Sequence, residues 1–199
     1  MGLRETKAKK TRKRIFSEAL QLFKRDGYEQ TTMEAIAEAA EVSPSTLYRY
    51  FPTKDLILLG AMSGYDLSAA FSRHSVNLSA EEALAEAILE WAKWEDANAE
   101  EIRLVRSLID RAPIPRARLW DVVYQQIWDL SARLAEKLHL PENDLQVVLS
   151  ARLVFTIIGT AADRWRANAA GSSSVAIAKQ VMRMFEAHKV LIPRKATRR

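Results

Sequence analysis

Residues 31–54 read TTMEAIAEAAEVSPSTLYRYFPTK, and this stretch decides the fold. A short helix is predicted to begin at Thr31 or Thr32, and Thr31 with Glu34 fits the T-x-x-E pattern of a capping box. Apolar residues at three- and four-residue spacing then give this helix one inward face. The stretch therefore opens with a capped, amphipathic helix.

A tight turn at residues 41–42 separates this helix from a second short helix. Ser43 is a favourable N-cap, and Pro44 suits the first helical position because its φ is already fixed near the helical value. Pro52 ends the second helix, since proline restricts the residue before it and lacks an amide hydrogen to donate. The spacing thus predicts two short helices joined by a turn.

The second helix carries a surface that is suited to DNA. Leu47 and Phe51 are expected to face the core, which frees the other side chains to enter the major groove, as in a helix-turn-helix. Small polar residues can approach base edges, Arg49 can bond guanine or a phosphate, and tyrosine hydroxyls suit phosphate oxygens. Amides at the start of the first helix offer further phosphate donors. The candidate DNA-binding residues are Thr31, Thr32, Pro44, Ser45, Thr46, Tyr48, Arg49, Tyr50 and Lys54.

A basic segment precedes the two short helices, because residues 1–14 hold seven Lys/Arg and one Glu. A longer helix is expected over residues 7–25, and Gly27 follows it where a left-handed residue ends a helix at least cost. Tyr28 would then fold back onto Phe23. The basic residues therefore lie next to the predicted DNA-reading helices.

Charge is distributed unevenly over the 199 residues, whose formal net charge is +5. Residues 1–54 carry 11 Lys/Arg and 7 Asp/Glu, giving +4, and the tail over residues 193–199 adds another +4. Residues 55–192 therefore carry −3. A basic front and an acidic body favour a polyanionic partner for the front alone.

Apolar residues recur at three- and four-residue spacing along almost the whole chain, and no strand-like alternation of useful length occurs. The chain is therefore predicted to be all-α, with about nine helices. Beyond residue 54, helices are expected over residues 55–75, 80–97, 100–111, 115–139, 142–168 and 173–189. The expected domains are a helix-turn-helix DNA-binding domain with a basic N-terminal arm over residues 1–54 and a larger helical ligand-binding and dimerisation domain over residues 55–199.

The segment AEAAEVSPSTLYRYFPTKDLIL resembles the DNA-binding domain of the tetracycline-repressor (TetR) family of bacterial regulators. The matching features are Ile36-Ala37, Val42-Ser43, Thr46-Leu47-Tyr48, and Tyr50-Phe51 followed by Lys54. The resemblance covers about residues 10–60. It implies a nine-helix subunit that forms a homodimer, binds a palindromic operator, and releases it when a small molecule enters the larger domain.

Glu41 departs from the family pattern, which usually has glycine at this point of the turn. A non-glycine residue in a left-handed conformation costs roughly 1–2 kcal/mol. Either the turn geometry differs slightly, or Glu41 bears this strain.

Aromatic stripes in the larger domain are either plain core or part of a ligand pocket. Small-molecule pockets are mostly apolar with a few polar anchors, and the TetR resemblance implies ligands between these helices. Tyr124, Asn98 and Arg106 are the candidate anchors. The candidate ligand-binding residues are Met62, Tyr65, Trp91, Asn98, Arg106, Trp120, Tyr124, Trp128 and Phe155.

Three further stretches, RLVRSLIDRAPIPRARL, KLHLPENDL and LVFTIIGTAADRW, resemble the C-terminal domain of the mycofactocin-system regulator and its relatives. Some of these relatives respond to long-chain acyl-CoA. The resemblance implies an apolar effector, with an acyl-CoA-like compound as one alternative. Its anionic head would meet Arg103, Arg106, Arg111, Arg116 and Arg118. Alternatively, these arginines are solvated or paired with acids.

The last two long helices are expected to form a dimer interface. The final helix is apolar on two sides and so needs two partners. Pairing both helices with their symmetry mates would make a four-helix bundle, a self-complementary two-fold contact. The candidate interface residues are Phe155, Ile158, Gly159, Ala162, Trp165, Val181 and Phe185.

The chain is expected to be a cytoplasmic DNA-binding repressor, and the alternatives are an enzyme and a membrane-attached protein. An enzyme is not expected, because His74, His139 and His188 are scattered and no catalytic set, phosphate loop or metal spacing accompanies them. No cofactor is expected either. Residues 1–6 fit a myristoylation pattern, and the basic residues that follow it would favour membrane attachment. These basic residues are equally suited to binding DNA. No apolar run is expected to approach the ~18 residues of a membrane span, and no signal peptide is expected.

Overall fold

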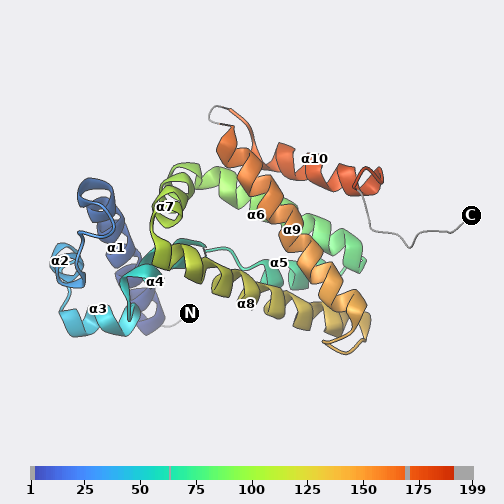
Figure 1. Cartoon of the computed structure of the whole chain (residues 1–199). Helices are drawn as coiled ribbons and strands as arrows, with labels where there is room; N and C mark the ends of the chain where they lie inside the picture. Colours follow the sequence, from blue (N-terminus) through green and yellow to red (C-terminus); the bar gives the residue numbers. More distant parts are fainter. Residues whose placement is uncertain (1–2, 63, 169–170, 191–199) are drawn as a thin grey trace, which may run out of the picture. The chain divides into compact units, whose positions relative to one another are not determined.

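The computed structural model describes residues 3–62, 64–168 and 171–190, and in these ranges it is all-helical (Figure 1). The start of the myristoylation pattern and the basic tail lie outside the described residues. The predicted all-α fold class is confirmed. The described helices are α1 (Leu3–Asp26), α2 (Met33–Ala39), α3 (Pro44–Tyr50), α4 (Lys54–Met62), α5 (Leu67–His74), α6 (Ala80–Ala97), α7 (Ala99–Arg111), α8 (Pro113–Leu138), α9 (Leu145–Ala167) and α10 (Ser174–Glu186).

The chain divides into two compact units. Residues 1–65 and 99–124 form the first unit, so α7 and the first part of α8 pack with the N-terminal helices. Residues 66–98 and 125–199 form the second. These structural units differ from the expected division at residue 54, and the functional division of the chain stays a prediction.

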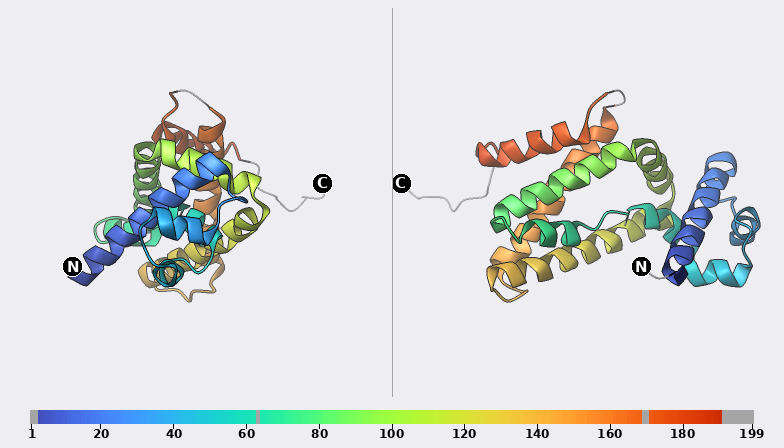
Figure 2. Two further views of the ribbon diagram at one scale, coloured as in Figure 1. Left: turned by 90° about the vertical axis from the view of Figure 1, so that its left-hand side faces the viewer. Right: turned by 180° about the vertical axis from the view of Figure 1, so that it is seen from behind.

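The first unit has one apolar core that α1, α2, α3, α4 and α7 share. Ile15, Phe23, Ile36 and Leu47 are buried in it, as is Phe51 just after α3. From α7 the same core receives Val105, Ile109 and, just beyond the helix, Ala112. Figure 2 shows the three N-terminal helices from two further directions. Burial of these side chains holds α2 and α3 on a support far larger than either short helix could supply.

The second unit is built around α6, which packs against α5 and α10, while α10 also packs against α9. Its buried side chains include Phe71, Ile88 and Trp165. The Ser174 hydroxyl donates to the Glu95 carboxylate at 2.6 Å, which ties the start of α10 to the end of α6. Buried polar groups of this kind are stabilising only because they are hydrogen-bonded.

The helix expected over residues 55–75 is wrong, because the structure has two helices there, α4 and α5. Asp66 lies between them with an extended backbone (φ −96°, ψ 96°), and its carboxylate accepts a hydrogen bond from the Ala69 amide at 2.9 Å. An N-cap aspartate satisfies an amide that has no partner within the helix. Asp66 therefore starts a new helix where hydrophobic spacing alone predicted continuation.

The helix α9 is long and apolar enough, by length and composition, to cross a membrane: an 18-residue window of it has a mean hydropathy of 1.7 and is 28% buried in the structure. The sequence expectation had not recognised this run. A helix that packs in the core of a soluble protein meets the same criterion. One face of α9 is indeed buried, with Val147, Ala151 and Val154 among its members.

Candidate nucleic-acid interface

The start of α2 is fixed by Thr32, whose side chain accepts a hydrogen bond from the Ala35 amide at 3.1 Å. Thr31 instead is buried, and its hydroxyl donates to the carbonyl of Gly27 at 2.8 Å. The predicted capping box of Thr31 and Glu34 is therefore wrong by one residue. Of the two threonines, Thr32 is the one exposed at the positive end of the helix.

The start of α3 follows the predicted pattern. Ser43 is the N-cap, its side chain accepts from the Thr46 amide at 3.2 Å, and Pro44 is the first helical residue. The Ser43 hydroxyl also donates to the Thr46 hydroxyl at 2.9 Å and lies 3.0 Å from the Ser45 hydroxyl. Three small hydroxyl groups thus gather at the N-terminus of α3.

Two anchors orient α3, because Leu47 and Phe51 are buried as expected. The Arg12 guanidinium stacks on the Phe51 ring, 4.9 Å from its centroid, and so braces this anchor from α1. The face opposite the anchors is open, with Pro44, Ser45, Tyr48 and Arg49 exposed and Thr46 and Tyr50 half-buried. Pro44, Ser45, Tyr48 and Arg49 therefore share one exposed surface, whereas Tyr50 also packs against the core.

Tyr48 and Glu34 connect the exposed faces of α3 and α2. The Tyr48 side chain is 44% exposed, and its hydroxyl donates to the Glu34 carboxylate at 3.3 Å. Partial desolvation first, and then the Glu34 charge and hydrogen bond, raise the pKa of Tyr48. The phenol therefore stays protonated at neutral pH and can donate to a phosphate oxygen once Glu34 releases it. Sequence spacing did not identify Glu34 as a partner.

The turn between α2 and α3 is closed in the Schellman manner. The Val42 amide donates to the Ala37 carbonyl at 3.0 Å, and the Glu41 amide donates to the Glu38 carbonyl at 2.9 Å. This pattern needs a left-handed residue at Glu41, whose φ is 49°. Of the two alternatives for this turn, the structure therefore has Glu41 bearing the strain.

Lys54 has a different role from the expected phosphate clamp. Its ammonium donates to the carbonyls of Tyr28 at 2.6 Å, Thr31 at 2.9 Å and Glu29 at 3.2 Å, which uses all three of its donors. It also lies 4.4 Å from the centroid of the Tyr28 ring. The structure thus contradicts a direct phosphate contact by Lys54 and makes it a clasp for the loop before α2.

Tyr28 completes this clasp. Its ring packs against Phe23 with centroids 5.2 Å apart, as predicted for the end of α1, and Gly27 has the expected left-handed backbone with φ 88°. Burial first, and then the nearby Asp55 carboxylate, raise the pKa of Tyr28. Asp55 is buried and forms an ion pair with Arg118 at 2.8 Å. Arg118 is therefore already paired with an acid, which agrees with the alternative that these arginines pair with acids rather than with a ligand.

The predicted basic arm is helical, because α1 already begins at Leu3. Lys9, Lys10, Lys13 and Arg14 are exposed on it, and Arg14 lies 3.7 Å from the exposed Glu41 carboxylate. Surface pairs of this kind contribute little to stability. These cations therefore remain available to a polyanion, and Arg14 lies beside the turn between α2 and α3.

The candidate ligand-binding residues are spread over both units. Trp120, Tyr124 and Trp128 are 65%, 52% and 59% exposed on α8, so the structure contradicts their enclosure in a pocket. Asn98 ends α6, and its side-chain amide donates to the Trp94 carbonyl at 2.7 Å. Arg106 pairs with Asp110 at 3.4 Å. The half-buried candidates are Met62, Tyr65, Trp91, Asn98, Arg106 and Phe155.

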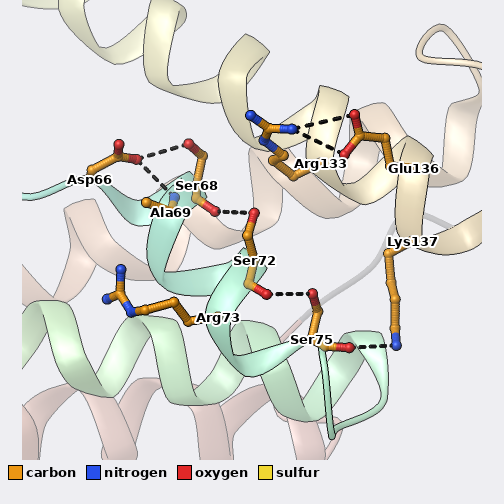
Figure 3. Close-up of a pocket in the computed structure, with 9 residues that line it drawn as sticks. All are labelled: Asp66, Ser68, Ala69, Ser72, Arg73, Ser75, Arg133, Glu136 and Lys137. Atoms are coloured by element: carbon orange, nitrogen blue, oxygen red, sulfur yellow. Dashed lines mark hydrogen bonds and ion pairs between the residues drawn. The ribbon is translucent and has the colours of Figure 1, made fainter.

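A polar groove of about 670 Å³ lies in the second unit between α5 and α8 (Figure 3). None of the predicted ligand-binding residues is among those that line it. Its cations are already engaged, since Arg133 donates to Glu136 at 3.1 Å, Arg73 to Glu90 at 2.6 Å, and Lys137 to the Ser75 carbonyl at 2.7 Å. This groove therefore does not take the place of the predicted apolar pocket.

The candidate interface residues divide by burial. Trp165 is buried within the second unit, so its predicted place in a dimer interface is wrong for this structure. Gly159 is exposed, with open space around the position of a Cβ atom. The face of α9 that remains open carries Leu145, Leu149 and Leu153 at four-residue spacing, which sequence patterning had missed. The half-buried candidates are Phe155, Ile158, Ala162, Val181 and Phe185.

Together, the capped α2, the Schellman turn and the anchored α3 define a helix-turn-helix domain. The family model described as "Bacterial regulatory proteins, tetR family" matches residues 15–61, which span all three helices of this domain. The resemblance to the TetR family of regulators is therefore carried by residues 15–61.

Known proteins resemble the chain in two ways. The transcriptional regulator TcmR of Streptomyces glaucescens is 48% identical over 65 residues, which are 33% of this chain and 29% of TcmR. The match to this curated relative thus spans less than a third of its length. The structure also resembles FadR of Thermus thermophilus with lauroyl-CoA (22% identity, TM-score 0.58, 94% and 98% of the two chains) and FadR of Bacillus subtilis with stearoyl-CoA (22%, 0.61, 86% and 95%). The two FadR structures support the fold of the whole chain.

Proposed function

We propose that this protein is a ligand-responsive transcriptional regulator, a homodimeric repressor that a small apolar effector releases from a palindromic operator. One observation carries the proposal: the open face of α3, held by the buried Leu47 and Phe51, lies in the same compact unit as the exposed cations of α1. Such a face reads base edges, while cations beside it neutralise phosphates. The matching family model supports this interpretation.

Each residue of the surface has a proposed task. Ser45 and Thr46 contact base edges, Arg49 bonds guanine or a phosphate, and Tyr48 and Tyr50 bond phosphate oxygens. Pro44 lets the start of α3 approach the bases closely, and Thr32, rather than Thr31, presents the amides of α2 to a phosphate. Lys54 contributes indirectly, because it holds the loop that leads into α2.

The dimer is proposed to form through α9 and α10. Two recognition helices can enter successive major grooves only when they lie about 34–36 Å apart. The open leucines of α9 and the exposed Met184 of α10 give both helices apolar surface that a second copy would cover. A two-fold contact of this kind is self-complementary, as a palindromic operator requires.

The effector is proposed to cover the aromatic side chains of α8. Trp120, Tyr124 and Trp128 expose large apolar rings to water in this structure, and an apolar ligand would remove them from it. The two FadR proteins were solved with acyl-CoA molecules, which makes an acyl-CoA-like effector the first to test. The C-terminal part is proposed to be of the mycofactocin-regulator type, with Arg103, Arg106, Arg111 and Arg116 near the anionic head.

The mechanism is proposed to be a shift between two conformations. The effector weakens DNA binding only to the extent that it binds the conformation with the wrong helix spacing more tightly. Lauroyl-CoA is the probe, and its addition should lower the anisotropy of a fluorescent operator bound to the protein. A fully bound operator at saturating lauroyl-CoA would refute this choice of effector.

DNA binding is tested by selecting bound fragments from the source genome and titrating the recovered palindrome at several salt concentrations. The logarithm of affinity should fall linearly with the logarithm of salt, because several Lys/Arg displace counterions. Arg49→Ala should weaken operator binding by roughly 5- to 150-fold, the range of about 1–3 kcal/mol for one lost base contact. The matched control is Lys93→Ala, an exposed cation on α6. Failure to recover any fragment at low salt would refute the proposal.

A further inference from the structure

A second groove lies wholly within the first compact unit, between the end of α1, the loop over residues 27–30, and α7. Its volume is about 450 Å³, which is in the range of small-molecule sites of roughly 300–1,000 Å³. The lining includes none of the nine candidate ligand-binding residues. Arg111, which was proposed above to lie near the anionic head of the effector, also lines this groove.

The floor of this groove is apolar. Phe23 and Tyr28 are buried and pack against each other, while Leu104 and Leu108 of α7 are half-buried on the opposite wall. Half-buried leucines leave apolar surface in water, and an apolar ligand can cover that surface. The groove therefore suits a molecule with an apolar body.

The rim is basic. Lys24 and Arg111 are exposed and line the groove, together with the single acid Glu29. Among the residues that the structure describes, neither cation forms an ion pair with an acid. We infer that this groove binds an amphiphilic anion, whose apolar body lies on Leu104 and Leu108 and whose carboxylate or sulfonate meets Lys24 and Arg111.

A bound molecule would contact the loop that leads into α2. The same loop is held by Lys54 through the carbonyls of Tyr28, Glu29 and Thr31, and Thr32 follows it as the N-cap of α2. Occupancy of the groove therefore bears directly on the position of α2. This consequence for DNA rests on the proposed function, whereas binding in the groove does not.

Binding is tested on the full chain with 8-anilinonaphthalene-1-sulfonate, an aromatic sulfonate. Its titration should shift the ¹³C-methyl resonances of Leu104 and Leu108 and raise the fluorescence of the probe. Arg111→Glu should weaken the fitted affinity by roughly three- to tenfold, because it reverses one charge beside the sulfonate. Lys93→Glu changes the net charge equally and should leave the affinity unchanged. The uncharged probe N-phenyl-1-naphthylamine should not respond to Arg111→Glu.

Two results would overturn the inference. The first is an absence of methyl shifts at Leu104 and Leu108 while the probe saturates elsewhere on the protein. The second is equal weakening by Arg111→Glu and Lys93→Glu, which would reduce the effect to net charge. Lys24→Glu repeats the test from α1, should Arg111→Glu fail to fold. Operator affinity is measured separately, so methyl shifts without any change in DNA binding would retain the site and refute only its proposed consequence.

Discussion

Lys54 satisfies three backbone carbonyls of a loop that precedes α2. Substitution of Lys54 by Met keeps most of the apolar stem and removes the ammonium. We expect Lys54→Met to lower the free energy of unfolding by about 2–3 kcal/mol, because a charged donor and several part-buried acceptors lose their partners. Urea denaturation followed by circular dichroism measures this loss.

Lys24→Met serves as the control for this prediction, since Lys24 is exposed and its ammonium forms no hydrogen bond or ion pair within the described residues. It should change stability by no more than about 0.5 kcal/mol. Unaltered stability of Lys54→Met, accompanied by weaker binding to every DNA sequence, would instead restore the phosphate role.

Glu41 has a left-handed backbone that glycine adopts without strain. Glu41→Gly should raise the free energy of unfolding by about 0.5–1 kcal/mol, because strain of roughly 1–2 kcal/mol is relieved and the flexibility of glycine in the unfolded chain offsets part of it. Thermal denaturation should show a higher midpoint.

Glu38→Gly provides the opposite case in α2, the helix that precedes the turn. Glu38 is exposed within α2, where glycine is expected to be destabilising by about 1 kcal/mol. A lower melting midpoint for Glu41→Gly than for the unmodified protein would show that the left-handed conformation carries no strain.

At the scale of the element, α5 depends on its N-cap. The Ala69 amide, followed by the Ser68 hydroxyl, lowers the pKa of Asp66. A depressed carboxyl pKa means that the stabilisation is present above the ordinary pKa of 3.8 and is lost as the pH falls through the lower folded-state pKa. Asp66→Ala should therefore cost about 1 kcal/mol at pH 7 and progressively less below the ordinary pKa.

Chemical denaturation of the unmodified protein and of Asp66→Ala between pH 2 and pH 7, a range of roughly five units, tests how their difference in stability depends on pH. Asp121→Ala, which removes an exposed carboxylate from the middle of α8, should show no such pH-dependent difference. A constant difference for Asp66→Ala over the whole range would mean that the charge of the cap is unimportant.

Local chemistry made the short helices predictable. Ser43, Pro44 and Leu47 act through contacts within a few residues, so their roles in α3 can be inferred from spacing alone. The Lys54 contacts join residues 23 to 26 positions apart, and no sequence period encodes them. In α8, the four-residue spacing of its aromatic residues identified one face correctly, but it cannot tell a buried face from an exposed one.

At the scale of the whole molecule, the open leucines of α9 test the proposed dimer. Leu149→Glu adds a charge to the middle of this apolar row, which would be costly to bury without a partner. Sedimentation velocity should show a shift from dimer to monomer at micromolar protein, with the helical circular dichroism spectrum retained. Operator affinity should fall with it, because one recognition helix alone reads half a site.

Val76→Glu is the matched control for Leu149→Glu, since Val76 is an exposed apolar residue in the second unit that lies outside α9 and α10. It should remain dimeric. Sedimentation of Leu149→Glu as an intact dimer would place the contact between subunits on some other surface.

The first unit is built from two separate segments of the chain, which has a practical consequence for the design of fragments. Val105 and Ile109 of α7 belong to the same apolar core as the N-terminal helices, although residues 66–98 of the second unit separate them along the chain. A gene fusion that borrows only the first 54 codons would thus leave out part of the wall against which α1 and α4 pack. A fusion protein that carries this helix-turn-helix domain therefore needs to include α7 as well, or to supply a substitute apolar surface.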